Sequence, residues 1–200
     1  ISCKNMAQFN IGRVQRIPGV SSVATPSVDA QVQIPLSFWA RGLGVSGEDR
    51  LVAIFVGVGA VSVVNLSTGA AMTGPALASP VFGTPWSVAF YNNKWMFGGG
   101  DNTSIYQLDS DSTYSAVTGT PTPPGGNLIK ALLNRLYIAD IAAEPGLVKY
   151  SDVLTTNFNV LNILNVREIP GVITSLAVNS PTTDTEGIGT QLIISKSNAM

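Results

Sequence analysis

A strand–turn–strand pattern that occurs twice at nearly constant spacing is the feature that most constrains the fold of this chain. Tight turns are expected at Asn92-Asn93 and at Asn134-Arg135, each between two short apolar segments, and the asparagines that open them lie 42 residues apart. Asparagine tolerates the positive φ that a two-residue hairpin turn requires. The spacing therefore predicts two copies of one unit, each of which opens with a tight hairpin.

The remaining apolar segments are also typical of strands. They are short, rich in Val, Ile, Phe and Tyr, and interrupted by Gly, Pro, Asn, Ser or Thr before a helical periodicity can develop. The sequence therefore predicts an all-β fold. The expected strands are Leu51–Val56, Ala60–Asn65, Trp86–Tyr91, Lys94–Gly98, Ser104–Asp109, Leu128–Leu133, Arg135–Ala139, Leu147–Ser151, Ile173–Asn179 and Gln191–Ser195.

Each unit is expected to contain four strands. The segments Trp86–Thr120 and Leu128–Val166 carry the pattern best, and their third strands contain Tyr106 and Tyr150, which are 44 residues apart. Four strands per repeat, with a period in the low forties, is typical of β-propeller blades. The alternative is a β-sandwich with accidental spacing, but a sandwich gives no reason for the turn and the aromatic residue to recur together.

Two further units are suggested on either side of this pair. One is Leu51–Leu66, and the other is Ile173–Met200, in which Pro181–Gly189 would lengthen the first hairpin loop. We therefore expect an N-terminal strand-and-loop segment over residues 1–35 and β-propeller blades of four antiparallel strands over residues 36–200, with the last blade unfinished. Because a propeller has to close, this chain is expected to be an incomplete portion of a larger propeller.

Composition excludes several classes of chemistry. The chain has no histidine, which removes Ser-His-Asp and Cys-His catalysis as well as His-ligated metal sites. Eleven Lys and Arg against twelve Asp and Glu give a net charge of −1 without a basic cluster, so no surface for gripping nucleic acid is expected. The longest apolar run, Leu51–Val64, is too short to span a membrane. The single cysteine, Cys3, is expected to be a small apolar residue and not a nucleophile.

Two motifs are similar to ligand-binding loops, but a structural role is favoured for both. Gly98-Gly99-Gly100-Asp101 could approach a phosphate, but neither a Lys-Ser/Thr pair nor a helix follows it, so a flexible inter-strand loop is expected. Asp109-Ser110-Asp111-Ser112 could hold calcium, and Asp111 to Tyr114 is faintly similar to the Asp-box turn of sialidase-like propellers. The glycine of that box and a completing Glu are absent, so turn capping by Asp and Ser is expected.

The carboxylates near strand ends do not single out a catalytic pair. Candidates for glycoside hydrolysis are Asp101, Asp140, Glu144 and Asp152, but nothing in their spacing selects two of them. Asp152 is expected to hold the turn after its strand by accepting backbone N–H bonds. We therefore assign no catalytic, cofactor-binding or metal-binding residue and expect no cofactor.

The three tryptophans could stack on sugars or fill a core. Trp86 and Trp95 lie on expected inner strands, where packing between blades needs large side chains, so they are expected in the core. Trp39 is left open between the two roles.

Several phrases of the sequence are similar to one known family. They are Lys4-Asn5-Met6 followed by Gly12-Arg13-Val14-Gln15-Arg16-Ile17-Pro18-Gly19, then Val148-Lys149-Tyr150-Ser151-Asp152 with Phe158, then Gly171-Val172-Ile173-Thr174-Ser175-Leu176, and Leu192-Ile193-Ile194-Ser195-Lys196-Ser197. With these phrases the chain resembles the β-propeller tail proteins of bacteriophages, especially the nozzle or tail-hub proteins of short-tailed phages. It departs from the family in having Ile17 between Arg16 and Pro18.

This resemblance implies a virion structural protein without enzymatic activity, made in the host cytoplasm and built into the phage tail. Such a protein forms a ring around the DNA exit channel, contacts other tail or adaptor proteins, and lets DNA pass without sequence-specific binding. A cyclic homo-oligomer, most simply a hexamer, is the expected assembly. The alternatives are a carbohydrate- or receptor-binding propeller and a glycoside hydrolase. An exposed aromatic platform beside carboxylates would favour these alternatives, whereas a broad apolar surface would favour the structural role.

Overall fold

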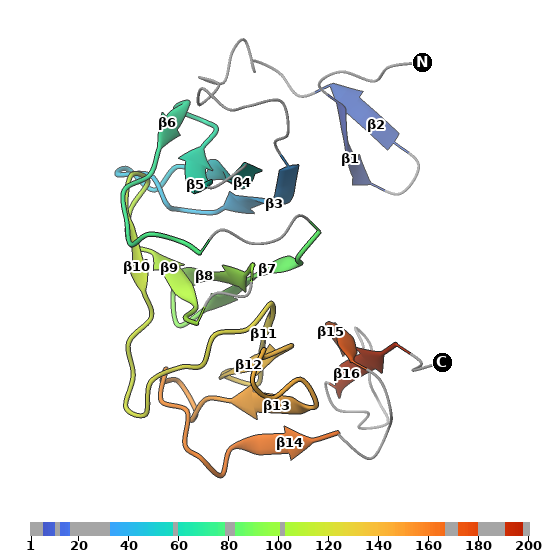
Figure 1. Cartoon of the computed structure of the whole chain (residues 1–200). Helices are drawn as coiled ribbons and strands as arrows, with labels where there is room; N and C mark the ends of the chain where they lie inside the picture. Colours follow the sequence, from blue (N-terminus) through green and yellow to red (C-terminus); the bar gives the residue numbers. More distant parts are fainter. Residues whose placement is uncertain are drawn as a thin grey trace, which may run out of the picture.

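The fold was analysed in a computed structural model that describes residues 6–10, 13–16, 33–57, 60–78, 83–100, 103–166, 172–179 and 191–197. The regular secondary structure in these ranges consists of strands that pair antiparallel, and no helix occurs in them (Figure 1). This confirms the predicted all-β class. In this part of the chain there is accordingly no helix that could cross a membrane.

The strands form three four-stranded sheets and two hairpins, each with its strands in chain order. The first sheet contains β3 (Gln33–Ala40), β4 (Arg50–Gly57), β5 (Ala60–Asn65) and β6 (Ala70–Ala71). The second sheet contains β7 (Trp86–Tyr91), β8 (Lys94–Gly99), β9 (Tyr106–Leu108) and β10 (Tyr114–Ala116). The third sheet contains β11 (Leu128–Leu132), β12 (Arg135–Ala139), β13 (Leu147–Tyr150) and β14 (Ile163–Asn165). The N-terminal hairpin pairs β1 (Met6–Asn10) with β2 (Arg13–Arg16), and the C-terminal hairpin pairs β15 (Ile173–Asn179) with β16 (Gln191–Lys196).

All ten predicted strands are present, with bounds that differ by up to two residues. The strands not delimited from the sequence are β3, which contains a proline, the short outer strands β6, β10 and β14, and the N-terminal hairpin. Since β3 begins at Gln33, the first sheet starts before the boundary expected after residue 35. The predicted long loop Pro181–Gly189 lies outside the described residues.

The two tight turns are present, but the second is one residue earlier than predicted. Asn92 and Asn93 have φ of 49° and 59°, and Leu133 and Asn134 have φ of 47° and 56°. The second turn is therefore Leu133-Asn134 and not Asn134-Arg135. The hairpins of the second and third sheets consequently correspond at an offset of 41 residues, since Tyr91 pairs with Lys94 and Leu132 with Arg135.

The two third-strand tyrosines are not equivalent, contrary to the sequence comparison. Tyr106 pairs with Phe97, whereas Tyr150 pairs with Tyr137, the neighbour of the residue that corresponds to Phe97. Because successive side chains on a strand point to opposite faces, Tyr106 and Tyr150 face opposite sides of their sheets. Tyr106 faces the first sheet and Tyr150 faces away from the second.

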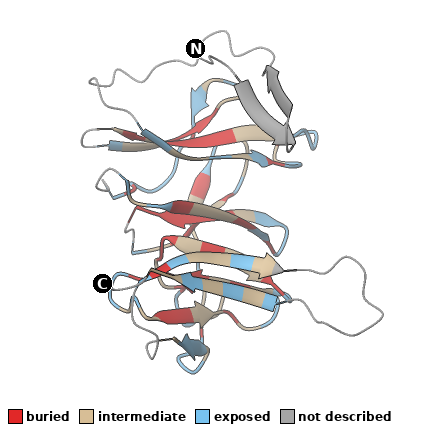
Figure 2. Cartoon of the chain, turned by 90° about the vertical axis from the view of Figure 1, so that its right-hand side faces the viewer, coloured by how far each residue is buried: buried red, intermediate tan, exposed pale blue. Residues whose placement is uncertain are grey.

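The sheets stack face to face in chain order, and the core lies between them (Figure 2). Between the first and second sheets lies a cluster that includes Ile54, Trp86, Phe97, Tyr106 and Tyr114, which we call the first interface. Between the second and third sheets lies a cluster that includes Met96, Ile105, Ile129, Leu136 and Ile138, which we call the second interface. The C-terminal hairpin packs on the other face of the third sheet through Ile173, Leu176 and Ile194.

The opening strands of successive sheets lie side by side. Strand β3 contacts β7, β7 contacts β11, and β11 contacts β15, while the outer strands β6, β10 and β14 lie at the far edges of their sheets (Figure 1). None of the five sheets closes into a barrel, and the described residues form an open stack.

Candidate functional site

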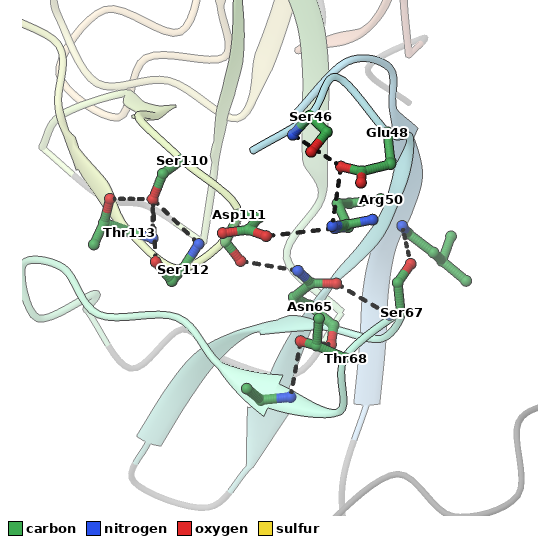
Figure 3. A network of polar contacts seen from close by, with 12 residues as sticks. Ser46, Glu48, Arg50, Asn65, Ser67, Thr68, Ser110, Asp111, Ser112 and Thr113 are labelled. Atoms are coloured by element: carbon green, nitrogen blue, oxygen red, sulfur yellow. Dashed lines mark hydrogen bonds and ion pairs between the residues drawn. The ribbon is translucent and has the colours of Figure 1, made fainter. Parts of the chain in front are cut away.

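A network of polar side chains crosses the first interface at its outer end (Figure 3). Asn65, which is fully buried at the end of β5, donates from Nδ2 to the Asp111 carbonyl of the second sheet at 2.8 Å. Arg50 Nε lies 3.5 Å from Asp111 Oδ2, and Arg50 also pairs with Glu48. The network therefore joins the first sheet to the second, although the buried Arg50 Nε has no hydrogen-bond partner among the described residues.

The Asp109–Ser112 motif forms the turn between β9 and β10, and Ser110 caps it. The Ser110 Oγ accepts hydrogen bonds from the backbone N–H of Ser112 at 3.2 Å and of Thr113 at 3.1 Å. Turn capping is thus confirmed for Ser110, whereas Asp111 pairs with Arg50. Within the described ranges no group of three His, Cys, Asp or Glu residues is placed to hold a metal ion.

The candidate carboxylates each have a different local partner. Asp140 Oδ2 accepts from Asn127 Nδ2 at 2.9 Å, Glu144 forms an ion pair with Lys149, and Asp152 Oδ1 accepts from Asn162 Nδ2 at 2.7 Å. Asp152 holds its turn through its backbone, since its N–H donates to the Asn157 carbonyl at 2.8 Å and its carbonyl accepts from Thr155 N–H. Its carboxylate accepts from the Asn162 side chain, and the expected hydrogen bonds from backbone N–H groups to that carboxylate do not occur among the described residues. Asp101, like Cys3, lies outside the described residues.

The first two residues of the glycine motif belong to a strand, Gly100 lies in the turn that follows, and Asp101 lies outside the described residues. Gly98 and Gly99 are the last residues of β8, and both are buried. A Cβ on Gly98 would lie 2.8 Å from the Gly126 carbonyl oxygen, and one on Gly99 would lie 2.5 Å from the Pro85 carbonyl oxygen. The prediction of a flexible loop is therefore wrong for Gly98 and Gly99, where neighbouring backbones approach closely enough to require glycine.

The three tryptophans have different environments. Trp86 is 7% exposed in the first interface, as predicted, and its Nε1 has no hydrogen-bond partner. Trp95 packs against the same cluster but is only partly buried, so its core assignment is half right. Trp39 is 47% exposed and therefore does not lie in the core.

Trp95 lines a groove between the first and second sheets, which we call the Trp95 groove. Its volume is about 340 Å³. It is lined by Arg41, Gly42, Leu43, Phe90, Asn93, Lys94, Trp95, Leu108 and Asp109. One open depression beside the β7–β8 turn therefore contains aromatic rings together with positively and negatively charged side chains.

The Asp109 carboxylate in this groove is held in its ionised form. Partial burial raises its pKa, but hydrogen bonds from Ser115, Lys94 and Gln107, together with the Lys94 charge, outweigh burial and leave the pKa below its ordinary value. Lys94 Nζ donates to Asp109 Oδ1 at 3.1 Å and Gln107 Nε2 donates to it at 2.8 Å. The carboxylate is thus ionised, and these hydrogen bonds fix its orientation.

A second groove lies on the other side of the same hairpin, between the turns of the second and third sheets, and we call it the Asn134 groove. Its volume is about 400 Å³, and its lining includes Phe90, Asn93, Leu133, Asn134 and Leu154. Leu133 and Leu154 both have positive φ, 47° and 57°, and both are more than half exposed. Phe90 and Asn93 line both grooves, so the two depressions are neighbours around one side chain.

Sequence reasoning did not find Phe90, Arg41 or Lys94. A usable signal was present in the repeat itself, because at the corrected offset of 41 residues Phe90 corresponds to Ala131 and Trp95 to Leu136. An aromatic pair in one copy of a hairpin and aliphatic residues in the other indicates a feature that the fold does not require.

Comparisons of the chain with protein-family models, with curated proteins and with solved structures found no match.

Proposed function

We propose that the four-stranded sheets are blades of a β-propeller and that the chain is a structural component of a bacteriophage tail, at the nozzle or hub. The observation that carries the architectural part is the succession of contacts from β3 to β7, β11 and β15. In a propeller the opening strand of every blade lies near the central axis, so opening strands of consecutive blades are neighbours while outer strands diverge.

The use of both faces of the second sheet supports this arrangement over a sandwich. One face packs in the first interface through Phe97, and the other packs in the second interface through Met96. A two-sheet sandwich buries one face of each sheet, so it accounts for only one of these interfaces. Consecutive blades of a propeller bury both.

An apolar surface near the outer strand of the third sheet supports a role in assembly. Val160 and Leu161 are 77% and 81% exposed, and Ile163 and Leu164 on β14 are exposed as well. Neighbouring exposed apolar residues are typical of protein–protein contact surfaces. We propose that they contact neighbouring subunits of a cyclic homo-oligomer, with six subunits as the simplest ring, or other tail proteins.

The carboxylates support a structural role over hydrolysis. Asp140, Glu144 and Asp152 each bind a different side chain in or next to the third sheet, and no contact joins any two of them in the described ranges. A glycoside hydrolase needs two carboxyl groups that flank one bond of the substrate. We therefore propose that the chain acts through surfaces and an axial channel, and not as an enzyme.

Native mass spectrometry and end-on electron micrographs of the purified protein test this proposal. We expect a cyclic particle whose blades radiate from the centre and whose interfaces each bury more than about 1,000 Å². Leu161→Glu should weaken the assembly while leaving the β-sheet circular dichroism unchanged. Val45→Glu is the matched control, because Val45 is 92% exposed in the loop between β3 and β4. A stable, non-aggregating monomer would overturn the proposal.

A further inference from the structure

We propose that the Trp95 groove and the Asn134 groove together form a saccharide-binding site, in which a sugar ring stacks on Phe90 and its hydroxyl groups bond to Asp109, Lys94 and Asn93. This inference goes beyond the proposed tail role, and an exposed aromatic ring beside a carboxylate is the feature named above as favouring a carbohydrate-binding propeller. It rests on three features of the end of the molecule that carries the β7–β8 turn.

The first feature is a row of aromatic rings that leads from the core to the surface. Phe38 packs on Trp95 with ring centroids 5.7 Å apart, and Trp95 packs on Phe90 with centroids 5.0 Å apart. The Trp95 indole is further fixed by its Nε1–H, which donates to the Arg41 carbonyl at 3.2 Å. Phe90, at the end of the row, is 50% exposed. A supported and exposed ring of this kind offers a flat apolar face, which is the complement of the C–H face of a pyranose.

The second feature is the set of polar groups beside this ring. Asp109 presents a carboxylate whose direction is fixed by Lys94 and Gln107, and Lys94 adds an ammonium group on the same wall. A carboxylate accepts from two neighbouring hydroxyl groups, and an ammonium donates to their oxygens. Sugars present hydroxyl groups in this way at the rim of an apolar ring face.

The third feature is the pair of asparagine turns on the other side of Phe90. Asn92, Asn93 and Asn134 have positive φ, and their side-chain amides make no hydrogen bond to the described residues. An amide offers both donors and an acceptor, which suits hydroxyl groups that can act as either. Since Asn93 lines both grooves, a second sugar unit can continue from the Trp95 groove into the Asn134 groove.

Other ligand classes fit these groups less well. A nucleic acid strand needs cations along its phosphates, but of the two cations that line the Trp95 groove, Lys94 is already paired with Asp109. An apolar peptide would leave the asparagine amides without partners. The remaining cation, Arg41, lines the same groove and is the natural partner of a sugar carboxylate, so an acidic saccharide should bind more tightly than a neutral one.

The aromatic platform is not demanded by the fold. The third sheet forms the same hairpin with Ala131 and Leu136 at the corresponding positions, and its stacking on the second sheet is preserved. Packing in the first interface accounts for Trp95, but it does not require an exposed phenylalanine at position 90.

The test is calorimetric titration of the full chain with hexasaccharides of maltose, cellulose, chitin, polygalacturonate and hyaluronan type. We expect binding to at least one acidic member, a loss of about tenfold in affinity with Phe90→Ala, and near-complete recovery with Phe90→Tyr. Arg41→Gln should reduce binding of acidic saccharides while leaving that of neutral ones unchanged. Trp39→Ala is the matched control, because Trp39 is similarly exposed but lines neither groove.

Each outcome decides the proposal. Failure of every hexasaccharide to bind would overturn it, and so would binding that Phe90→Ala leaves unchanged or that Trp39→Ala lowers equally. Circular dichroism of Phe90→Ala verifies that the variant is folded. The oligomer measurements described above are independent of this result, so the two proposals can fail separately.

Discussion

The first and second interfaces join sheets of the same topology with different chemistry. The first interface is filled by aromatic rings: Phe97 stacks on Tyr106 at 5.6 Å and meets Tyr114 edge-on at 5.8 Å. The second is filled mainly by aliphatic side chains, among them Ile105, Leu136 and Ile138. Strand β7 correspondingly lies in closer contact with β11 than with β3. The two interfaces thus differ in the volume of the side chains that fill them.

Small residues at the inner end of the second interface make the closer approach possible. Ser87 Oγ donates to the Asn127 carbonyl at 2.8 Å and accepts from Ile129 N–H at 2.7 Å, so one hydroxyl joins β7 directly to the start of β11. Gly98 lies against the Gly126 backbone nearby. The second interface therefore adds close backbone contacts at its inner end to its aliphatic core, whereas the backbone hydrogen bonds of the first interface, between Thr73 and both Ser112 and Tyr114, lie beside the outer strands.

Truncation of the central residue of each interface should show the largest effects. Phe97→Ala is expected to lower the free energy of unfolding by about 4 kcal/mol and Ile138→Ala, at the corresponding position, by about 3 kcal/mol, because each removes a fully buried side chain and leaves a cavity. Urea denaturation followed by circular dichroism measures both. A loss below about 2 kcal/mol for Phe97→Ala would mean that the aromatic cluster does not hold the first interface.

Gly98→Ala tests the backbone contact of the second interface. The new Cβ would lie 2.8 Å from the Gly126 carbonyl oxygen and 3.0 Å from Ile105 Cγ2, so we expect a loss of about 2 to 3 kcal/mol in the free energy of unfolding. The matched control is Ala139→Gly, at the corresponding position of the third sheet, which should cost about 1 to 2 kcal/mol through greater backbone freedom and the loss of one buried methyl group. An unchanged denaturation midpoint for Gly98→Ala would show that the two backbones can separate freely.

The strands that could be predicted from the sequence are those whose own residues carry a local signal. The long central strands were found because their apolar runs and asparagine turns are local signals. The outer strands β10 and β14 were not delimited, because three-residue strands at a sheet edge are determined by the neighbouring strand and not by their own residues. The second turn was placed one residue late because Leu133 has a φ that leucine rarely adopts.

The candidate site could not be predicted from the sequence, because it too depends on contacts between separate segments. The inner-strand position of Trp95 predicts a core residue, whereas the structure places its side chain against the first interface and only partly buried. Arg41 and Lys94 are 53 residues apart in sequence, and only the stacking of two sheets brings them to one groove. Contacts between sheets leave no periodic signal in a single sequence.

Each interface contains a tyrosine whose hydroxyl group forms hydrogen bonds across it, and the two differ in the number of their partners. Tyr91 Oη lies 2.8 Å from the Thr155 carbonyl, 3.1 Å from the Asn134 carbonyl and 3.2 Å from Ser151 Oγ, whereas Tyr114 Oη donates to the Pro75 carbonyl alone, at 2.8 Å. Tyr91→Phe is expected to cost about 2 kcal/mol of unfolding free energy and Tyr114→Phe about 1 kcal/mol. The opposite order in thermal and urea denaturation would mean that the Tyr91 contacts do not act together.

The smallest effect concerns the charges at the outer ends of the third strands. Asp109 accepts from the cationic Lys94, whereas Asp152, which follows the corresponding strand of the third sheet, accepts from the neutral amide of Asn162. Hydrogen bonds and the Lys94 charge hold the pKa of Asp109 below its ordinary value against the opposing effect of burial, so its ionised form is favoured in the folded state. The stabilisation is therefore fully present above the pKa of the unfolded state, near 3.9, and is lost as the pH falls through the lower pKa of the folded state.

Because the pair is exposed to solvent, Asp109→Asn should cost less than about 1 kcal/mol at neutral pH. The difference from the unmodified protein should shrink below about pH 4 and also in about 1 M salt, which screens exposed charges. Asp152→Asn should not share the salt dependence, because its partner is uncharged, and urea denaturation across pH and salt measures both variants. An effect of Asp109→Asn that is independent of both variables would show that the carboxylate acts through hydrogen bonds alone.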